Sequence, residues 1–224
     1  MNMAVRGAFQ RQLRDLQSDV LELGNMVAKA IDRSIEALKT RDTEAARQII
    51  ADDHNIDHKR YDIEEQCLRL IATQQPMAGD LRTIITALHI VSELERMGDH
   101  AEGIAKINLM MGQQPLLKPL IDVPRMAQKA QDMLGRSLDA FLTKDMAAAK
   151  QIIEEDDEVD ALYDQVYREL VTFMIEDPRT ITRATHLLWV AHNLERIADR
   201  VTNICERVVF YATGKREDLE VSRY

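Results

Sequence analysis

The sequence predicts an all-α protein in which six helices form two tandem, repeat-related three-helix bundles. Aromatic residues make up only 4% of the chain, while Ala, Leu, Ile, Glu, Arg and Met are plentiful, a composition that favours helix over strand. All five prolines lie at boundaries between long amphipathic segments. A short acidic segment, Glu95–Asp99, recurs 100 residues later as Glu195–Asp199. Such a recurrence indicates a duplicated architecture.

The first half contains three predicted helices. Apolar residues at steps of three and four over Phe9–Thr40 describe one stripe of a long amphipathic helix. The segment Thr40–Asp42 interrupts this stripe and offers side-chain acceptors to a second helix, Asp42–Ala72. A turn that contains Pro76 precedes a third helix, Asp80–Met110, for which Asp80 is the expected cap.

A linker rich in proline and glycine, residues 112–123, separates the first unit (1–111) from the second (124–224). In the second unit we expect Asp177 and Pro178 to supply the N-cap and the first turn of the last helix, which ends near Thr213 with Gly214 and Lys215 behind it. The helices expected there are Val123–Leu142, Asp145–Ile175 and a sixth that follows Asp177.

The two halves align residue by residue. Thr40–Asp42 matches Thr143–Asp145 at an offset of 103 residues, and the same offset relates the pair Asp53 and Asp57 to Asp156 and Asp160. By the third helix of each half the offset has become 100, which requires only a shorter loop in the second half. Each half therefore reads as the same three-helix unit.

Charge and composition exclude several classes of function. The chain carries 38 acidic and 29 basic residues, a formal net charge of −9, and a protein that binds phosphate backbones needs a basic surface, so nucleic acid is not expected as a partner. Two cysteines, Cys67 and Cys205, are too few for a disulfide framework, and a reducing cytoplasm is the simpler expectation. No uncharged stretch approaches the ~20 apolar residues that span a bilayer. Any membrane role is expected to be peripheral, through partners.

Four acidic pairs at spacing i,i+4 are the candidate functional residues. At about 100° per residue, the members of a pair lie on one side of a helix, and they share a sector with apolar residues of the same helix. We therefore expect each pair to face inward, on two neighbouring helices of each half. The pairs are Asp53 and Asp57, Glu95 and Asp99, Asp156 and Asp160, and Glu195 and Asp199.

Carboxylates gathered at an apolar interface need compensating charge, because desolvation and mutual repulsion disfavour free anions there. A metal ion provides it, and helical bundles form oxygen-rich metal sites from carboxylates on facing helices. Hard ions such as Fe(III), Mn(II), Mg(II) or Ca(II) suit these ligands, and Zn(II) is an alternative. Ion pairs with Arg60, Arg96 and Arg196 are the competing explanation for a plain bundle. No glycine-rich phosphate loop and no Ser/His/Asp or Cys/His signature supports an enzyme.

At these residues the sequence resembles the PhoU family, the phosphate-specific transport system accessory proteins. The most specific segments are Gln75–Arg82, Leu94–Asp99 and Asn193–Asp199, the last continuing to Thr202–Ile204. The repeated E(D)xxxD motif of the family matches the four acidic pairs. One departure is Arg200, where relatives often have histidine.

The resemblance implies a cytoplasmic, helical, often homodimeric protein of two three-helix bundles, with iron or zinc clusters on the acidic motifs in some members; manganese or magnesium is also possible. It implies a negative regulator of the phosphate-starvation response and of phosphate uptake. The implied partners are the nucleotide-binding subunit of the phosphate ABC transporter and a sensor histidine kinase. The alternative is a carboxylate-bridged metalloenzyme, an oxidase or a phosphohydrolase.

Overall fold

Six long helices make up almost all of the computed structural model, which describes residues 3–112 and 114–214. Residues 1–2, 113 and 215–224 fall outside the described part, and with them Lys215 and the outer ends of the two predicted units. Within the described ranges there is no strand, which confirms the all-α prediction. The elements are α1 (Met3–Thr40), α2 (Thr43–Gln74), α3 (Gly79–Met111), α4 (Asp122–Thr143), α5 (Met146–Glu176), the 3₁₀ turn η1 (Pro178–Thr180) and α6 (Ile181–Thr213).

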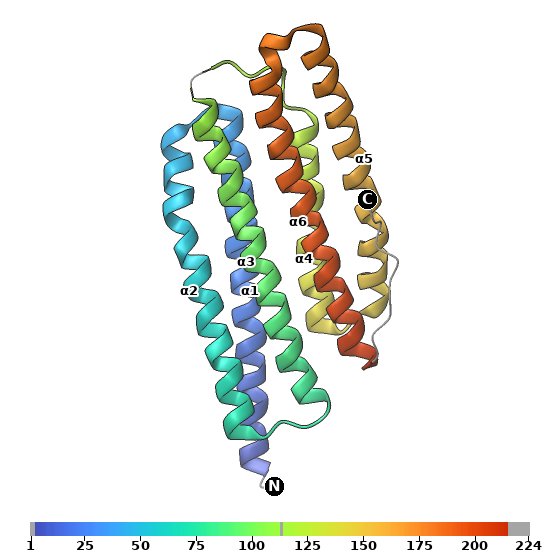
Figure 1. Cartoon of the computed structure of the whole chain (residues 1–224). Coiled ribbons are helices and arrows are strands. Elements are labelled where there is room, and N and C mark those ends of the chain that lie inside the picture. The colour runs from blue at the N-terminus through green and yellow to red at the C-terminus, as the bar shows by residue number, and fades with distance from the viewer. Residues whose placement is uncertain (1–2, 113, 215–224) are drawn as a thin grey trace.

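The helices form two three-helix bundles that lie side by side (Figure 1). Helices α2, α3, α6 and α5 form a front layer in that order, and α1 and α4 lie behind it. The central contact of the molecule is between α3 and α6, with a smaller contact between α1 and α4. The third helix of each half, α3 or α6, therefore lies at the centre of the molecule, next to the other bundle. The second helix, α2 or α5, lies at an outer edge.

The apolar stripe predicted on the first helix is buried along its whole length, although α1 begins six residues earlier than expected, at Met3. Burial of one such stripe removes several large side chains from water, each worth about 1.5–3 kcal/mol. The buried stripe consists of Phe9, Leu13, Leu16, Val20, Leu23, Val27, Ile31, Ile35 and Leu38.

Helix caps repeat between the halves as predicted. Asp42 Oδ1 accepts hydrogen bonds from the backbone N–H groups of Glu44 and Ala45 at 3.0 and 2.9 Å. Asp145 Oδ1 does the same for the second and third residues of α5 at 3.0 Å each. Each side chain satisfies N–H groups that the helix leaves without a partner. The first turns of α2 and α5 are thus fixed in the same way.

Two predicted helix starts are wrong in detail. Helix α3 begins at Gly79, so Asp80 lies inside its first turn, where it accepts a 3.5 Å hydrogen bond from Gln10 and does not act as the cap. Asp177 caps the 3₁₀ turn η1 through the N–H of Arg179, and α6 itself begins three residues after Pro178. Helix α3 thus starts earlier than predicted, and α6 starts later because a 3₁₀ turn takes up the predicted start.

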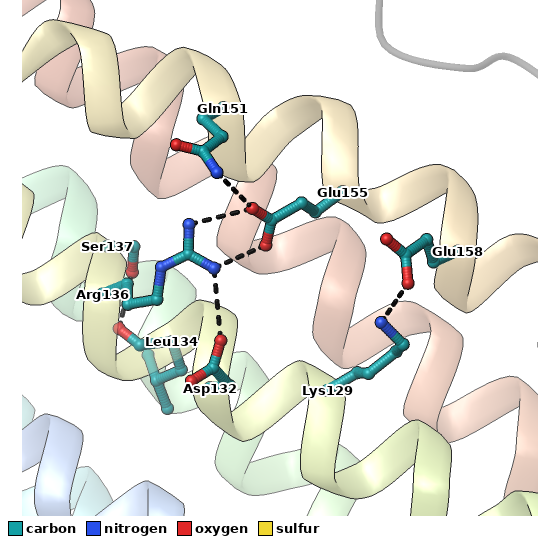
Figure 2. Close-up of polar contacts among 8 residues, drawn as sticks. All are labelled: Lys129, Asp132, Leu134, Arg136, Ser137, Gln151, Glu155 and Glu158. Carbon is teal, nitrogen blue, oxygen red and sulfur yellow. Dashed lines mark hydrogen bonds and ion pairs between the residues drawn. The ribbon is translucent and has the colours of Figure 1, made fainter.

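A polar brace joins the first and second helices of each half. In the second half, Arg136 of α4 makes two hydrogen bonds of 2.5 and 3.0 Å to Glu155 of α5, which also accepts one from Gln151 (Figure 2). In the first half, Arg33 Nη1 lies 2.7 Å from Asp52 Oδ2. All these residues correspond at an offset of 103, and each brace ends one residue before an acidic pair. The duplication therefore extends to individual hydrogen bonds.

Cys67 and Cys205 are both free thiols in the buried core, as two isolated cysteines predicted. Across residues 3–112 and 114–214, no helix combines the length and the apolar character needed to cross a membrane.

Candidate functional site

The structure brings the acidic pairs together within each half. On α2 and α3, Asp53 and Asp57 lie close enough to Asp99 for their charges to interact, and Asp57 also interacts with Glu95. We call Asp53, Asp57, Glu95 and Asp99 the first cluster. On α5 and α6 the corresponding residues Asp156, Asp160, Glu195 and Asp199 interact with one another in the same way and form the second cluster.

The expectation that all four pairs face inward is wrong for most of the eight residues. Only Asp156 is buried, at 3% exposure, while Asp99 is exposed and the others are half-buried. The space between the helices of each half is filled by apolar residues such as Ile56 and Met97 in the first half. The carboxylates therefore lie at the rim of the helix pair, where the groove between the helices opens.

Burial and mutual repulsion shift the acidities in both clusters. Desolvation, followed by the charges of Glu102 and Asp99, raises the pKa of Asp53 to about 6. Desolvation also raises the pKa values of Glu95 and Asp99. Burial and the neighbouring negative charges thus disfavour the ionised form of these three carboxyls.

The second cluster is shifted further. Desolvation, with the charges of Asp160 and Asp199, raises the pKa of Asp156 to about 7. Desolvation and the charge of Asp199 raise the pKa of Glu195 to about 7, although Arg196 opposes the shift. These two carboxyls consequently exchange protons near neutral pH, and a positive charge that entered the cluster would ionise them.

The basic residues around the clusters differ between the halves. Arg60 Nε lies 3.8 Å from Glu95 Oε1 in the first cluster. In the second cluster, Arg196 donates a short hydrogen bond to Asp199, and His192 Nδ1 lies 3.3 Å from Glu195 Oε2 without forming a hydrogen bond. The side chain of His192 is 55% exposed. Ion pairing thus compensates part of the charge in each cluster, as the competing explanation holds.

Two buried carboxylate oxygens among the described residues lack a hydrogen bond. Within the described part of the chain, Asp156 Oδ1 and Glu195 Oε2 are shielded from solvent and accept no hydrogen bond. Buried carboxylate oxygens without donors are costly, and a cation would satisfy them. The donor set is also chemically suitable, since hard ions prefer carboxylate oxygen. No three Asp, Glu, His or Cys side chains of residues 3–112 and 114–214 stand in a ready metal-binding arrangement, so binding would require side-chain rotation.

A cavity of about 300 Å³ opens beside the first cluster, between α1, α2 and α3. Its lining includes Lys29 and Arg33 of α1 as well as Asp53, Gly98 and Glu102. Ile56 of α2, which packs against Gly98, also lines this cavity. Solvent and small ions can therefore approach the first cluster from the side of α1.

The contact between α3 and α6 contains two corresponding polar pairs. His100 Nδ1 lies 3.0 Å from Asn193 Oδ1, and Arg200 Nη1 lies 3.4 Å from Glu93 Oε2, which also accepts a 3.1 Å hydrogen bond from Asn203. At an offset of 100 residues, His100 corresponds to Arg200 and Glu93 corresponds to Asn193. Each pair is therefore the counterpart of the other, with its two members on opposite helices. Arg200 therefore serves the contact between the two bundles.

Sequence reasoning omitted several residues that the structure places at the clusters. Glu102 interacts with Asp53 and Asp99, and Lys106 binds Glu102 one turn further along α3. Tyr163 interacts with Glu195 in the second half. Glu102 shares the helix sector of the motif, so extending the helical wheel by one turn would have included it.

Comparisons with known proteins agree with this architecture. The family model described as the PhoU domain matches the chain twice, at residues 20–107 and 123–208. A phosphate-specific transport system accessory protein PhoU homolog of Aquifex aeolicus is 42% identical over 205 residues, covering 92% of this chain and 93% of the relative. The phosphate-specific transport system accessory protein PhoU of Escherichia coli is 34% identical over 215 residues, covering 96% of this chain and 89% of the relative.

Solved structures share the fold. The phosphate transport system regulatory protein PhoU from Streptococcus pneumoniae superimposes with a TM-score of 0.87 at 34% identity, covering 94% of this chain and 100% of that one. PhoU from Pseudomonas aeruginosa superimposes with a TM-score of 0.87 at 35% identity, covering 92% of this chain and 100% of that one. The names describe accessory and regulatory proteins, in agreement with the prediction that the chain is not an enzyme. The chain belongs to the PhoU family and carries one PhoU domain in each of its two bundles.

Proposed function

We propose that this protein is a cytoplasmic negative regulator of phosphate uptake and of the phosphate-starvation response. In this proposal it is an adaptor that couples the nucleotide-binding subunit of the phosphate ABC transporter to a sensor histidine kinase. The names of its relatives, which describe accessory and regulatory proteins of phosphate transport, support the role. An adaptor needs surfaces and a stable shape, and two long bundles fused through α3 and α6 supply both.

The proposal includes metal ions, iron or zinc first and manganese or magnesium as alternatives, held by the two clusters. The observation that carries this part is the pair of buried oxygens without hydrogen bonds, Asp156 Oδ1 and Glu195 Oε2. A bound cation supplies the positive charge that carboxylates on two helices need to approach closely. The chain's contribution is to position Asp156 and Asp160 on α5 opposite Glu195 and Asp199 on α6, braced by the hydrogen bonds of Arg136 to Glu155.

Partner capture from cells grown in high and in low phosphate tests the regulatory role. The tagged, full-length protein should recover the transporter subunit and the kinase in at least one condition, and cells that lack the protein should express the starvation response constitutively. Failure to recover either partner in both conditions, with a normal response in the deletion strain, would contradict the proposal. Size-exclusion chromatography with light scattering tests the homodimer expected from the resemblance.

Elemental analysis of protein purified without chelator tests the metal component separately. We expect bound metal that is lost on dialysis against EDTA. Protein free of metal as purified, which also takes up none on addition, would leave the plain ion-paired bundle as the explanation for the clusters.

A further inference from the structure

One of the positions at which the two clusters differ is residue 60 in the first half, which an offset of 103 aligns with residue 163 in the second. In the first half this residue is arginine. Arg60 Nε lies 3.8 Å from Glu95 Oε1, and Arg60 Nη1 lies 3.3 Å from Glu64 Oε1. The side chains of Arg60 and Glu95 are only 19% and 20% exposed. A fixed positive charge is therefore built into the first cluster.

In the second half the same position holds a phenol. Tyr163 interacts with Glu195, and its ring lies 6.2 Å from the ring of His192. No lysine or arginine ion pair to Glu195 or Asp156 is present among the described residues. The nearby arginine, Arg196, is hydrogen-bonded to Asp199, whose side chain is 24% exposed. The arginine of the second cluster is thus paired with an aspartate, whereas the arginine of the first cluster lies beside the glutamate.

The second cluster is also more deeply buried than the first at the corresponding residues Asp156 and Asp53. Asp156 is 3% exposed with an oxygen that accepts no hydrogen bond in the described structure, whereas the corresponding Asp53 is half-buried and lines an open cavity. Glu195 also has a buried oxygen that accepts no hydrogen bond. An entering cation gains most where buried carboxylates lack other partners, because the attraction is stronger away from water.

We propose that the two clusters bind metal ions with unequal affinity, the second more tightly than the first, and that the exchange of Arg60 for Tyr163 sets the difference. This inference rests on the metal binding proposed above. In the first cluster a metal ion must share Glu95 with a guanidinium group and approach its positive charge. The resulting difference in dissociation constant is about tenfold, which corresponds to about 1.4 kcal/mol.

The test is a titration of the metal-free, full-length protein with Mn²⁺, in which electron paramagnetic resonance measures the free ion. We expect two classes of site. The variant Asp156→Asn/Glu195→Gln should lose the tighter class, and Asp53→Asn/Glu95→Gln should lose the weaker class. Circular dichroism would confirm that each variant keeps its helices.

Exchanging the residues at positions 60 and 163 then tests the cause. Arg60→Tyr should tighten the weaker class about tenfold, Tyr163→Arg should weaken the tighter class by a similar factor, and the double exchange should reverse the order. Arg60→Lys, which keeps the charge, and Arg47→Gln, which removes an exposed arginine elsewhere on α2, should leave both classes unchanged. Tyr163→Phe should also have little effect, because what matters at this position is that no cation lies beside Glu195.

The outcomes separate this inference from the proposed function. Two equal classes, a tighter first cluster, or affinities that do not respond to the exchange would overturn the inference and leave metal binding intact. A tenfold loss in Tyr163→Phe would overturn it as well, because the phenol would then be a ligand. Wild-type protein that binds no Mn²⁺, Fe²⁺ or Zn²⁺ would overturn both.

Discussion

Gly98 and Ile56 fit against each other so closely that a Cβ atom built on Gly98 would lie 3.1 Å from Cδ1 and 3.2 Å from Cγ2 of Ile56. The corresponding residues in the second half are Ala198 and Val159, both buried. In the first half the larger Ile56 on α2 is matched with glycine on α3. In the second half the smaller Val159 on α5 is matched with alanine on α6. The sum of volumes is conserved at the point where the second and third helices meet, beside each carboxylate cluster.

This exchange predicts a coupling between the two positions. Gly98→Ala gains about 1 kcal/mol of helix propensity but loses a similar amount or more through overpacking against Ile56. Ile56→Val makes room at a cost of about 0.5–1.5 kcal/mol. We expect the double variant to be more stable than the sum of the single effects by about 1 kcal/mol, measured as a double-mutant cycle by urea denaturation. Additive effects would show that the contact does not constrain the helices.

The repeated caps predict equal losses at distant positions. Asp42→Ala and Asp145→Ala should each lower the free energy of unfolding by about 1 kcal/mol, since each removes two hydrogen bonds to helix N–H groups. Asp42→Asn should recover most of the loss. Asp80→Ala is the matched comparison and should cost less than half as much, because Asp80 does not cap α3. An equal loss at Asp80 would contradict the helix start seen in the structure.

The raised pKa values of Asp156 and Glu195 predict how the stability of the metal-free protein depends on pH. In the unfolded chain these carboxyls lose their protons near pH 4, but in the folded protein only near pH 7. The folded state binds more protons between these values, so this contribution to stability is lost as pH rises from about 4 to about 7. Carboxylates with lowered pKa values, such as Asp52, act in the opposite direction at lower pH.

Asp156→Asn isolates the effect of the buried group. In the presence of EDTA, the variant should be more stable than the wild type at pH 8 by about 1–3 kcal/mol, with the difference vanishing near pH 4. Asp157→Asn, at an exposed neighbouring position, should change little at either pH. Urea denaturation at the two pH values is the measurement, and a variant less stable than the wild type at pH 8 would contradict the prediction.

Metal content should respond to each cluster separately. Replacing Glu95 and Asp99 by alanine should reduce the bound metal by about half and leave the helices in place, because the first cluster receives no ligand from α5 or α6 in the structure. The matched variant at Glu195 and Asp199 should remove the other half. Inductively coupled plasma mass spectrometry together with circular dichroism provides the measurement. Complete loss of metal from either variant would show that the clusters are not independent.

The polar pairs between α3 and α6 predict cooperative unfolding of the two bundles. Glu93 receives contacts from both Arg200 and Asn203, so Glu93→Ala should cost about 1–3 kcal/mol and leave two half-buried donors unpaired. Calorimetry should show a single transition for the wild type and a broadened or divided one for the variant. Glu36→Ala, which removes an exposed pair with Lys39, should shift the transition very little. A sharp transition in Glu93→Ala would argue against this coupling.

The order of the helices, the duplication and the caps at Asp42 and Asp145 could be predicted because they depend on local periodicity and on side chains that act within one turn. The grouping of the acidic pairs by half followed from the repeat. Their depth could not be predicted, since it depends on how far α2 and α5 rotate about their axes, and that rotation is set by contacts such as Ile56 on Gly98.

Contacts between helices far apart in sequence were also out of reach. The approach of Arg60 to Glu95 depends on how the two helices are aligned along their lengths. The pairing of Arg200 with Glu93 depends on which surfaces of the two bundles meet, and periodicity within one helix carries no information on either.

The two bundles are part of one chain and pack together through α3 and α6, which has a consequence for how such a protein can diverge. In a dimer of identical bundles, every codon change appears twice, so both copies stay alike. Here a change at position 60 leaves position 163 untouched, and a change at position 98 leaves position 198 untouched. Gene duplication followed by fusion thus allows one bundle to change its affinity for a ligand while the other keeps the original affinity.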